Sequence, residues 1–171
     1  MASGPFVAEV NRRKIAVAQP LLNPNCMKTV ELDEPQRLPV KKENVISMPL
    51  GLLGFEQVKK YVLLITPEEE PFLWLQMLDN QSQGFVVINP STAFPDYAPD
   101  IAQADIEFLG VQSPADALLL NIVTVRNGQA TANLKGPIVI NRHTLVGKQC
   151  IPTNVAEFSL QHPVSPMPVA A

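Results

Sequence analysis

The fold is decided by Ala117-Leu118-Leu119-Leu120-Asn121-Ile122-Val123-Thr124-Val125-Arg126, followed by Asn127-Gly128 and Gln129-Ala130-Thr131-Ala132-Asn133-Leu134. The first segment is long and apolar, and the last alternates small or apolar residues with polar ones, as strands do. Asn-Gly accepts the two positive φ angles of a type I′ turn. The sequence therefore predicts a β-hairpin over residues 117–134.

Further strands are expected on both sides of this hairpin. Residues 27–32 alternate apolar with polar residues, and the four ranges that follow are short apolar runs, rich in Val, Ile or aromatic residues and bounded by Pro, Gly, Asn or Asp. The expected ranges are 27–32, 45–48, 61–65, 72–77 and 85–88 upstream, with 137–140 and 145–151 downstream. Short helices are expected at 55–60 and 102–109.

Proline is abundant, with 17 residues among 171, and a proline inside a helix removes a backbone donor and clashes with the preceding turn. Short strands and turns are therefore favoured over long helices. The prediction is a mainly β, single-domain, β-barrel-like fold of roughly eight to ten short strands, antiparallel or mixed, with one or two short helices. Closure of the sheet is expected because it removes exposed edges.

The prolines also divide the chain, because they concentrate near its two ends. We expect residues 1–26 to form a flexible N-terminal extension and residues 152–171 to form a proline-rich C-terminal tail. Residues 27–151 are left as the folded domain.

Composition excludes several function classes. The net charge of −3 gives no basic field for nucleic acid or an anionic membrane, so neither partner is expected. The N-terminus lacks the apolar core of a signal peptide and no membrane-spanning run is present, which indicates the cytoplasm. Cys26 and Cys150 are isolated, the only histidines are His143 and His162, and no serine lies in a nucleophile elbow. No metal, cofactor or catalytic group is expected.

Acidic residues gather in residues 50–110, which hold nine Asp or Glu against two Lys. A solvated acidic face is the ordinary interpretation, and a surface for a basic partner is the alternative. Residues 94–100 mix acids with apolar and aromatic residues, as at the rim of an interface. The candidate partner-binding residues are Asp96, Tyr97, Asp100, Asp105 and Glu107.

Other conspicuous residues are expected to serve the structure. Gly51 and Gly54 flank two leucines in an expected turn. Trp74 alternates with Gln76 along an expected strand, so core packing is favoured over ligand stacking. Phe55, Asn133, Pro137 and Asn141 are also assigned to turns and strand entry.

Five segments, taken in order and spacing, resemble the FliW family of flagellar assembly factors over roughly residues 27–151. They are residues 51–55, 71–76, 85–90, 132–141 and 147–149, and the most telling is Ala132-Asn133-Leu134-Lys135-Gly136-Pro137-Ile138-Val139-Ile140-Asn141. Each segment alone is ordinary strand or turn sequence, but the ordered set is fairly specific.

The resemblance implies a non-catalytic cytoplasmic protein of bacterial flagellum biogenesis. Proteins of this kind bind flagellin and, in exchange, bind and antagonise CsrA, an RNA-binding repressor of flagellin translation. The implied partners are CsrA and flagellin, the implied role combines chaperone and translation regulator, and the free protein is expected to be a monomer. An acidic surface fits an antagonist of a basic RNA-binding protein.

Two other function classes stay open on the residues alone. A carbohydrate-active enzyme would need two carboxylates that face each other across a cleft. A small-ligand-binding β module would use Trp74 and its neighbours.

Overall fold

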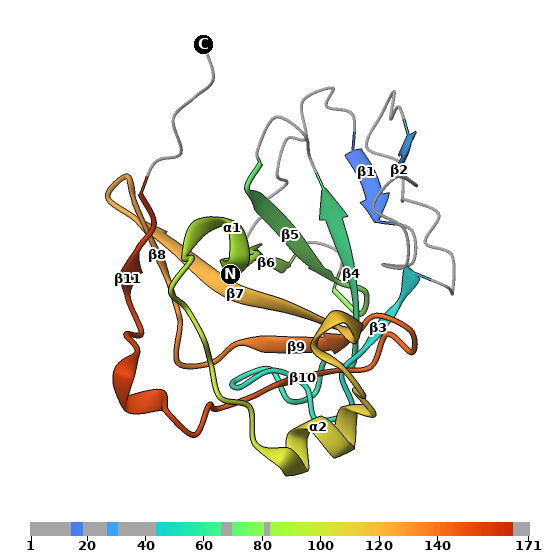
Figure 1. Cartoon of the computed structure of the whole chain (residues 1–171). Helices are drawn as coiled ribbons and strands as arrows, with labels where there is room; N and C mark the ends of the chain where they lie inside the picture. The colour runs from blue at the N-terminus through green and yellow to red at the C-terminus, as the bar shows by residue number, and fades with distance from the viewer. Residues whose placement is uncertain (1–14, 19–26, 31–43, 66–69, 81–82, 166–171) are drawn as a thin grey trace.

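The computed structural model describes residues 15–18, 27–30, 44–65, 70–80 and 83–165, and these form one β-rich domain (Figure 1). Its central element is the long strand β7 (Ala117–Arg126), which continues through a tight turn into β8 (Gln129–Ala132). Asn127 and Gly128 adopt φ angles of 51° and 75°, and Arg126 pairs with Gln129. The hairpin prediction is therefore confirmed.

Eleven strands are present in the described residues, all paired into one mostly antiparallel sheet. The main path is β10-β9-β7-β6-β5-β4-β1-β2, while β3 pairs with β4 and β11 pairs with β8. The other strands are β1 (Ile15–Ala18), β2 (Met27–Val30), β3 (Ile46–Ser47), β4 (Lys60–Ile65), β5 (Phe72–Met77), β6 (Gly84–Ile88), β9 (Ile138–Asn141), β10 (Gly147–Gln149) and β11 (His162–Pro163). A mainly β single domain with short helices is confirmed.

The sheet does not close into a barrel, which corrects that part of the prediction. Its path ends at β10 on one side and β2 on the other. An isolated parallel bridge between Ser47 and Val146 brings β3 against the start of β10, where the Ser47 amide donates to the Leu145 carbonyl over 2.8 Å. One bridge is too short to count as a strand ladder, so the sheet stays open between β3 and β10.

The helices are short, as the prolines predict. They are α1 (Pro90–Ala93), α2 (Gln103–Leu109) and two single 3-10 turns, η3 (Pro114–Asp116) and η4 (Val155–Glu157). The expected helix at 55–60 is wrong: the Phe55 amide donates to Leu52 and the Val58 amide to Phe55, which makes successive turns. Gly51 and Gly54 break the regular backbone immediately before this segment.

A strand lies inside each of the two segments assigned to the chain ends. β1 pairs with both β2 and β4, and β11 pairs with β8, where the Val164 amide adds a bond to the Ala130 carbonyl over 2.9 Å. Pairing partners distant in sequence stabilise these strands, so local composition does not reveal them. The rest of residues 1–26, with Cys26, and residues 66–69 and 166–171 lie outside the described part.

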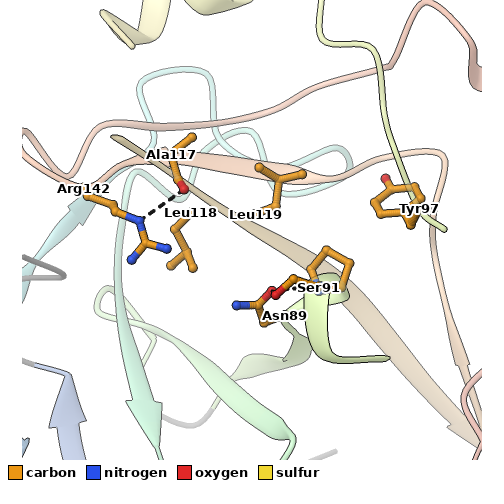
Figure 2. A pocket seen from close by; sticks show the side chains of 8 residues that line it. Asn89, Ser91, Tyr97, Ala117, Leu118, Leu119 and Arg142 are labelled. Atoms are coloured by element: carbon orange, nitrogen blue, oxygen red, sulfur yellow. Dashed lines mark hydrogen bonds between the residues drawn. The ribbon is translucent and has the colours of Figure 1, made fainter. Parts of the chain in front are cut away.

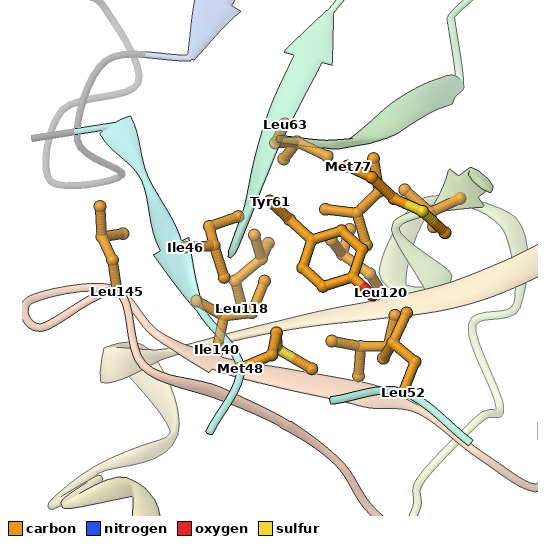
Figure 3. Packing of buried hydrophobic residues seen from close by; sticks show 13 residues of the cluster. Ile46, Met48, Leu52, Tyr61, Leu63, Met77, Leu118, Leu120, Ile140 and Leu145 are labelled. Atoms are coloured by element: carbon orange, nitrogen blue, oxygen red, sulfur yellow. The ribbon is translucent and has the colours of Figure 1, made fainter. Parts of the chain in front are cut away.

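The largest core cluster lies between the sheet and the loop that follows β3 (Figure 3). It packs Ile46, Met48 and Leu52 against β4, β5, β7 and β9. Tyr61 is completely buried in it. A second cluster around Phe94, Val123 and Leu134 packs against α1 and the C-terminal segment. This second cluster positions the loop that carries the candidate residues.

Candidate protein-binding surface

Asp96 and Tyr97 lie in the loop between α1 and α2, and only Asp96 is exposed. The Tyr97 hydroxyl donates to the Leu134 carbonyl over 2.8 Å, and its ring meets the edge of Phe158 with centroids 4.8 Å apart. Burial raises the pKa of Tyr97, and its hydrogen bond with Asn121 opposes that rise. Tyr97 thus fixes the loop, and Asp96 is the member of the pair that can meet a partner.

Asn121 is completely buried in the middle of β7 and was not singled out by the sequence analysis. Its Nδ2 donates to the Asn133 carbonyl over 2.8 Å and to the Tyr97 hydroxyl over 3.4 Å. Its Oδ1 has no hydrogen-bond partner in the described part of the chain. The available signal was one amide inside an otherwise apolar strand, since a buried amide needs partners. Asn133, predicted to be structural, belongs to this same network.

Asp100 is exposed but engaged with the segment that follows β10. Its carboxylate accepts from the Thr153 hydroxyl over 2.5 Å, and its carbonyl accepts from the Thr153 amide over 2.8 Å. The Asp100 amide donates to Asn154 Oδ1 over 2.9 Å. Asp100 therefore ties residues 153–154 to the loop.

The two acids of α2 differ in their surroundings. Asp105 forms an ion pair with Lys148 of β10, and their side chains keep only 14% and 24% of their exposure. The Lys148 ammonium also lies 5.4 Å from the centroid of the Phe108 ring, a cation–π contact. Glu107 points to solvent and accepts from Gln103 Nε2 over 3.1 Å. Of this pair only Glu107 offers an accessible carboxylate.

Asn141 is buried and joins α2 to the sheet. Its Nδ2 donates to the carbonyls of Leu109 and Gly110 over 2.9 and 3.2 Å, at the end of α2. Its Oδ1 accepts from the amides of His143 and Thr144 over 2.9 and 3.2 Å. All four bonds use buried or partly buried groups, so Asn141 sets the position of the helix that presents Glu107.

The remaining structural assignments have definite surroundings. Trp74 is half-buried, its Nε1 donates to Gln76 Oε1 over 2.8 Å, and its indole ring lies so close to Gly84 that a Cβ there would approach it to 2.8 Å. Phe55 meets Phe85 edge-to-face, with centroids 5.0 Å apart. Pro137 is completely buried at the entry to β9.

Leu50 and Leu53, in the turn after β3, are exposed. The turn is held rigidly, because the Leu53 amide donates to Gln149 Oε1 and the Gly54 amide to Glu56 Oε1, each over 2.9 Å.

A cavity of about 230 Å³ opens beside the first half of β7 (Figure 2). Asn89 and Ser91 line one side of it, at the start of α1, and residues 117–119 of β7 line the other. Arg142 stands at one end and Tyr97 at the other. The sequence analysis did not identify this site.

Side chains that could bind a metal ion are not clustered in the described residues. Those residues contain no group of three or more His, Cys, Asp or Glu that could hold a metal ion. Burial and then the nearby Asp105 carboxylate raise the pKa of Cys150 to about 12, so its thiol is protonated at neutral pH. Within the same residues no helix is long and apolar enough to cross a membrane.

The model of the FliW protein family matches residues 29–164, most of the chain and nearly all of the described domain. The chain belongs to the FliW family. The match runs past residue 151 to include η4 and β11, so the FliW domain contains the segment that Asp100 holds in place.

Individual members of the FliW family are similar to this chain in sequence and structure. The flagellar assembly factor FliW of Leptospira interrogans serogroup Icterohaemorrhagiae serovar copenhageni (strain Fiocruz L1-130) is 40% identical over 121 residues, which cover 69% of this chain and 81% of the relative. That of Treponema denticola is 35% identical over 127 residues, 73% of this chain and 85% of the relative. A crystal structure of the flagellar assembly factor FliW superposes with a TM-score of 0.67 and 35% identity, covering 74% of this chain and 89% of that one.

Proposed function

We propose that this protein is a non-catalytic, cytoplasmic regulator of flagellum assembly that binds flagellin and, in exchange for it, the RNA-binding repressor CsrA. Free protein captures CsrA and permits flagellin translation, whereas accumulated flagellin occupies the protein and releases CsrA. The observation that carries the proposal is membership of the FliW family over residues 29–164. We expect the protein to be a monomer when free and to need no cofactor.

The surface chemistry is compatible with a basic partner. Asp96, Asp100 and Glu107 are exposed on the α1–α2 loop and on α2, and Asp105 is neutralised by Lys148. An RNA-binding protein presents cations, and complementary potentials speed encounter and set specificity more than they set affinity. Because Asp100 also holds residues 153–154, we assign the direct contact with CsrA to Asp96 and Glu107.

Enzymatic use of these carboxylates has less support from the geometry. Asp105 is paired with Lys148, and Asp100 accepts a hydrogen bond from Thr153. A glycosidase needs one carboxyl group as a proton donor and another free to act as base or nucleophile. These two engaged carboxylates do not provide that combination.

The test is charge reversal at the two accessible acids. The D96K/E107K variant should weaken CsrA binding about tenfold and reduce its dependence on salt, because exposed charges act through screened, long-range attraction. The measurement is CsrA binding by calorimetry at two ionic strengths.

The matched control is E70K/D79K, which makes the same change in net charge at two other exposed acids. If both variants bind CsrA with equal affinity and equal salt dependence, Asp96 and Glu107 do not form the CsrA-binding surface. If the unaltered protein binds neither CsrA nor flagellin, the proposed function itself is rejected.

A further inference from the structure

The backbone of β7 alternates between its two edges, and its pairing shows which residues face which edge. The Arg142 amide donates to the Asp116 carbonyl over 2.7 Å, and the Asn133 amide donates to the Ile122 carbonyl over 2.9 Å. Even-numbered residues of this stretch therefore direct their amides and carbonyls toward β9 and β8. Ala117 and Leu119 direct theirs toward the opposite edge.

On that opposite edge the neighbouring strand stops early. β6 ends at Ile88, which pairs with Asn121, and the chain then enters α1 at Pro90. Pro90 would be the residue opposite Leu119 if the ladder continued, but it has no amide hydrogen, and its carbonyl accepts from the Phe94 amide over 2.8 Å. The sequence Asn89-Pro90 thus ends the ladder before β7 does.

Leu119 is left as an open position on the sheet edge. The Ala117 amide donates to the Pro114 carbonyl, and the Ala117 carbonyl accepts from Arg142 Nε over 3.1 Å. No described residue provides a partner for the Leu119 amide or carbonyl on this edge. A backbone donor and acceptor pair of this kind is a template for another extended chain.

The cavity described above lies at this same open position. Figure 2 shows the start of α1 facing Leu118 and Leu119 across it, with Arg142 at one end. Arg142 is the one residue with a charged side chain among those that line the cavity. The lining is otherwise apolar or neutral, so it suits a small uncharged side chain.

We propose that this edge binds an extended peptide segment of a partner protein, which adds as a short strand beside residues 117–120 and hydrogen-bonds to the backbone of Leu119. Main-chain bonds of this kind give affinity, and pockets for alternate side chains give specificity. One small neutral side chain of the segment enters the cavity. The choice of flagellin as the source of the segment rests on the proposed function.

Amide hydrogen exchange tests the edge directly. In the free protein the Leu119 amide should exchange much faster than those of Leu118 and Leu120, which face β9, and saturating flagellin should slow it to their rate. Exchange of Leu119 that is already as slow as that of Leu118 in the free protein would overturn the proposal. If Leu119 exchange slows as the concentration of the protein itself rises, without flagellin, a second copy of the chain binds this edge. That result would also overturn the proposal.

Substitution at the mouth of the cavity gives the second test. Ser91 is exposed and lines the cavity, and neighbouring Thr92 is exposed but does not line it, while both contact Asn89. Ser91→Trp should therefore weaken flagellin binding about tenfold or more, and Thr92→Trp should leave it unchanged. Thermal unfolding of the two variants checks that both remain folded.

The outcomes separate the two proposals. Flagellin that binds S91W and T92W equally, without slowing exchange at Leu119, overturns the edge assignment and leaves the proposed function standing. Flagellin that fails to bind the unaltered protein rejects both its role as partner and this assignment.

Discussion

Gly51 and Gly54 both adopt positive φ angles, of 70° and 84°, but for different reasons. A Cβ at Gly51 would lie 2.6 Å from the Cα of Glu56, whereas a Cβ at Gly54 would meet nothing within 4 Å. Backbone strain therefore acts at both positions, and a steric clash acts at Gly51 alone. The turn that displays Leu50 and Leu53 therefore depends on the close approach of Gly51 to the backbone of Glu56.

The two alanine variants should separate these effects. We expect Gly54→Ala to lower the free energy of unfolding by about 1 kcal/mol, through the left-handed backbone, and Gly51→Ala to lower it by about 3 kcal/mol or more. Urea denaturation of both variants measures the difference. Equal losses would mean that the turn relaxes freely around residue 51.

Residue types with strong local preferences were predictable from the sequence. The glycines of this turn and the Asn127-Gly128 pair are examples, because each demands a backbone conformation that few residues adopt. The partner of Asp105 was not predictable, since Lys148 lies 43 residues away in the sequence. Without such partners, the sequence also could not show which candidate acids are accessible to solvent.

Helix α2 depends on the sheet for its position more than on its own sequence. Its seven residues are too few for independent stability, and its N-cap residue Ala102 makes no side-chain cap. Leu109 packs against Val139 and Cys150, and Asn141 binds the last two carbonyls of the helical segment. Loss of the Asn141 donor should therefore release α2 before it disturbs the rest of the domain.

Asn141→Asp removes that donor and keeps an oxygen for the amides of His143 and Thr144. It also places a carboxylate beside two carbonyls in a buried site, so we expect a loss of about 3 kcal/mol or more in unfolding free energy. Amide exchange should rise first within α2. The same change at the exposed turn residue, Asn127→Asp, is the control and should cost little; equal effects would contradict the role of Asn141.

Strands whose own residues form a clear apolar run were predicted well from the sequence. β5 and β7 match their predicted ranges, because apolar runs between turn residues identify strands. α1 was missed, although its start has a local signal: Asn89 caps it and Pro90 is its first residue. β1 and β11 were also missed, since they are short, proline-flanked segments that pair with strands distant in sequence. The Leu119 edge was missed for a related reason: the end of a ladder depends on where two strands diverge.

At the scale of the whole molecule, the largest core cluster contains a polar group, the hydroxyl of Tyr61. The Tyr61 hydroxyl is buried without a hydrogen-bond partner among the described residues, and burial followed by the charge of Asp79 raises its pKa to about 12. A phenol that ionises at pH 10.0 when unfolded and at about 12 when folded favours the folded state least at high pH. Stability linked to Tyr61 is thus fully present below pH 10.0 and is lost as the pH rises toward 12.

Tyr61→Phe tests this dependence. At neutral pH the variant should be as stable as the unaltered protein, or more stable by about 1 kcal/mol, because an unsatisfied buried hydroxyl is removed. Between pH 10 and 12 the variant should lose less stability than the unaltered protein. Thermal unfolding across this range is the measurement, and parallel curves would show that Tyr61 does not titrate with unfolding.

The global shape was only partly predictable. Alternation and turn chemistry indicated a mainly β domain, but whether the sheet closes depends on the relative placement of its first and last strands. Here β3 and β10 meet through the Ser47–Val146 bridge alone, a contact between residues 99 positions apart that no local pattern encodes.

The length of β7 has a practical consequence for measuring these partners. The strand runs from the open edge at Leu119 to Arg126, just before the exposed turn at Asn127 and Gly128, and these seven steps of extended chain span about 24 Å. A fluorophore attached at that turn would lie outside the cavity. It would still be within energy-transfer range of a labelled partner that is bound at Leu119. Energy transfer from the hairpin turn would therefore report which labelled partner is bound and when it dissociates.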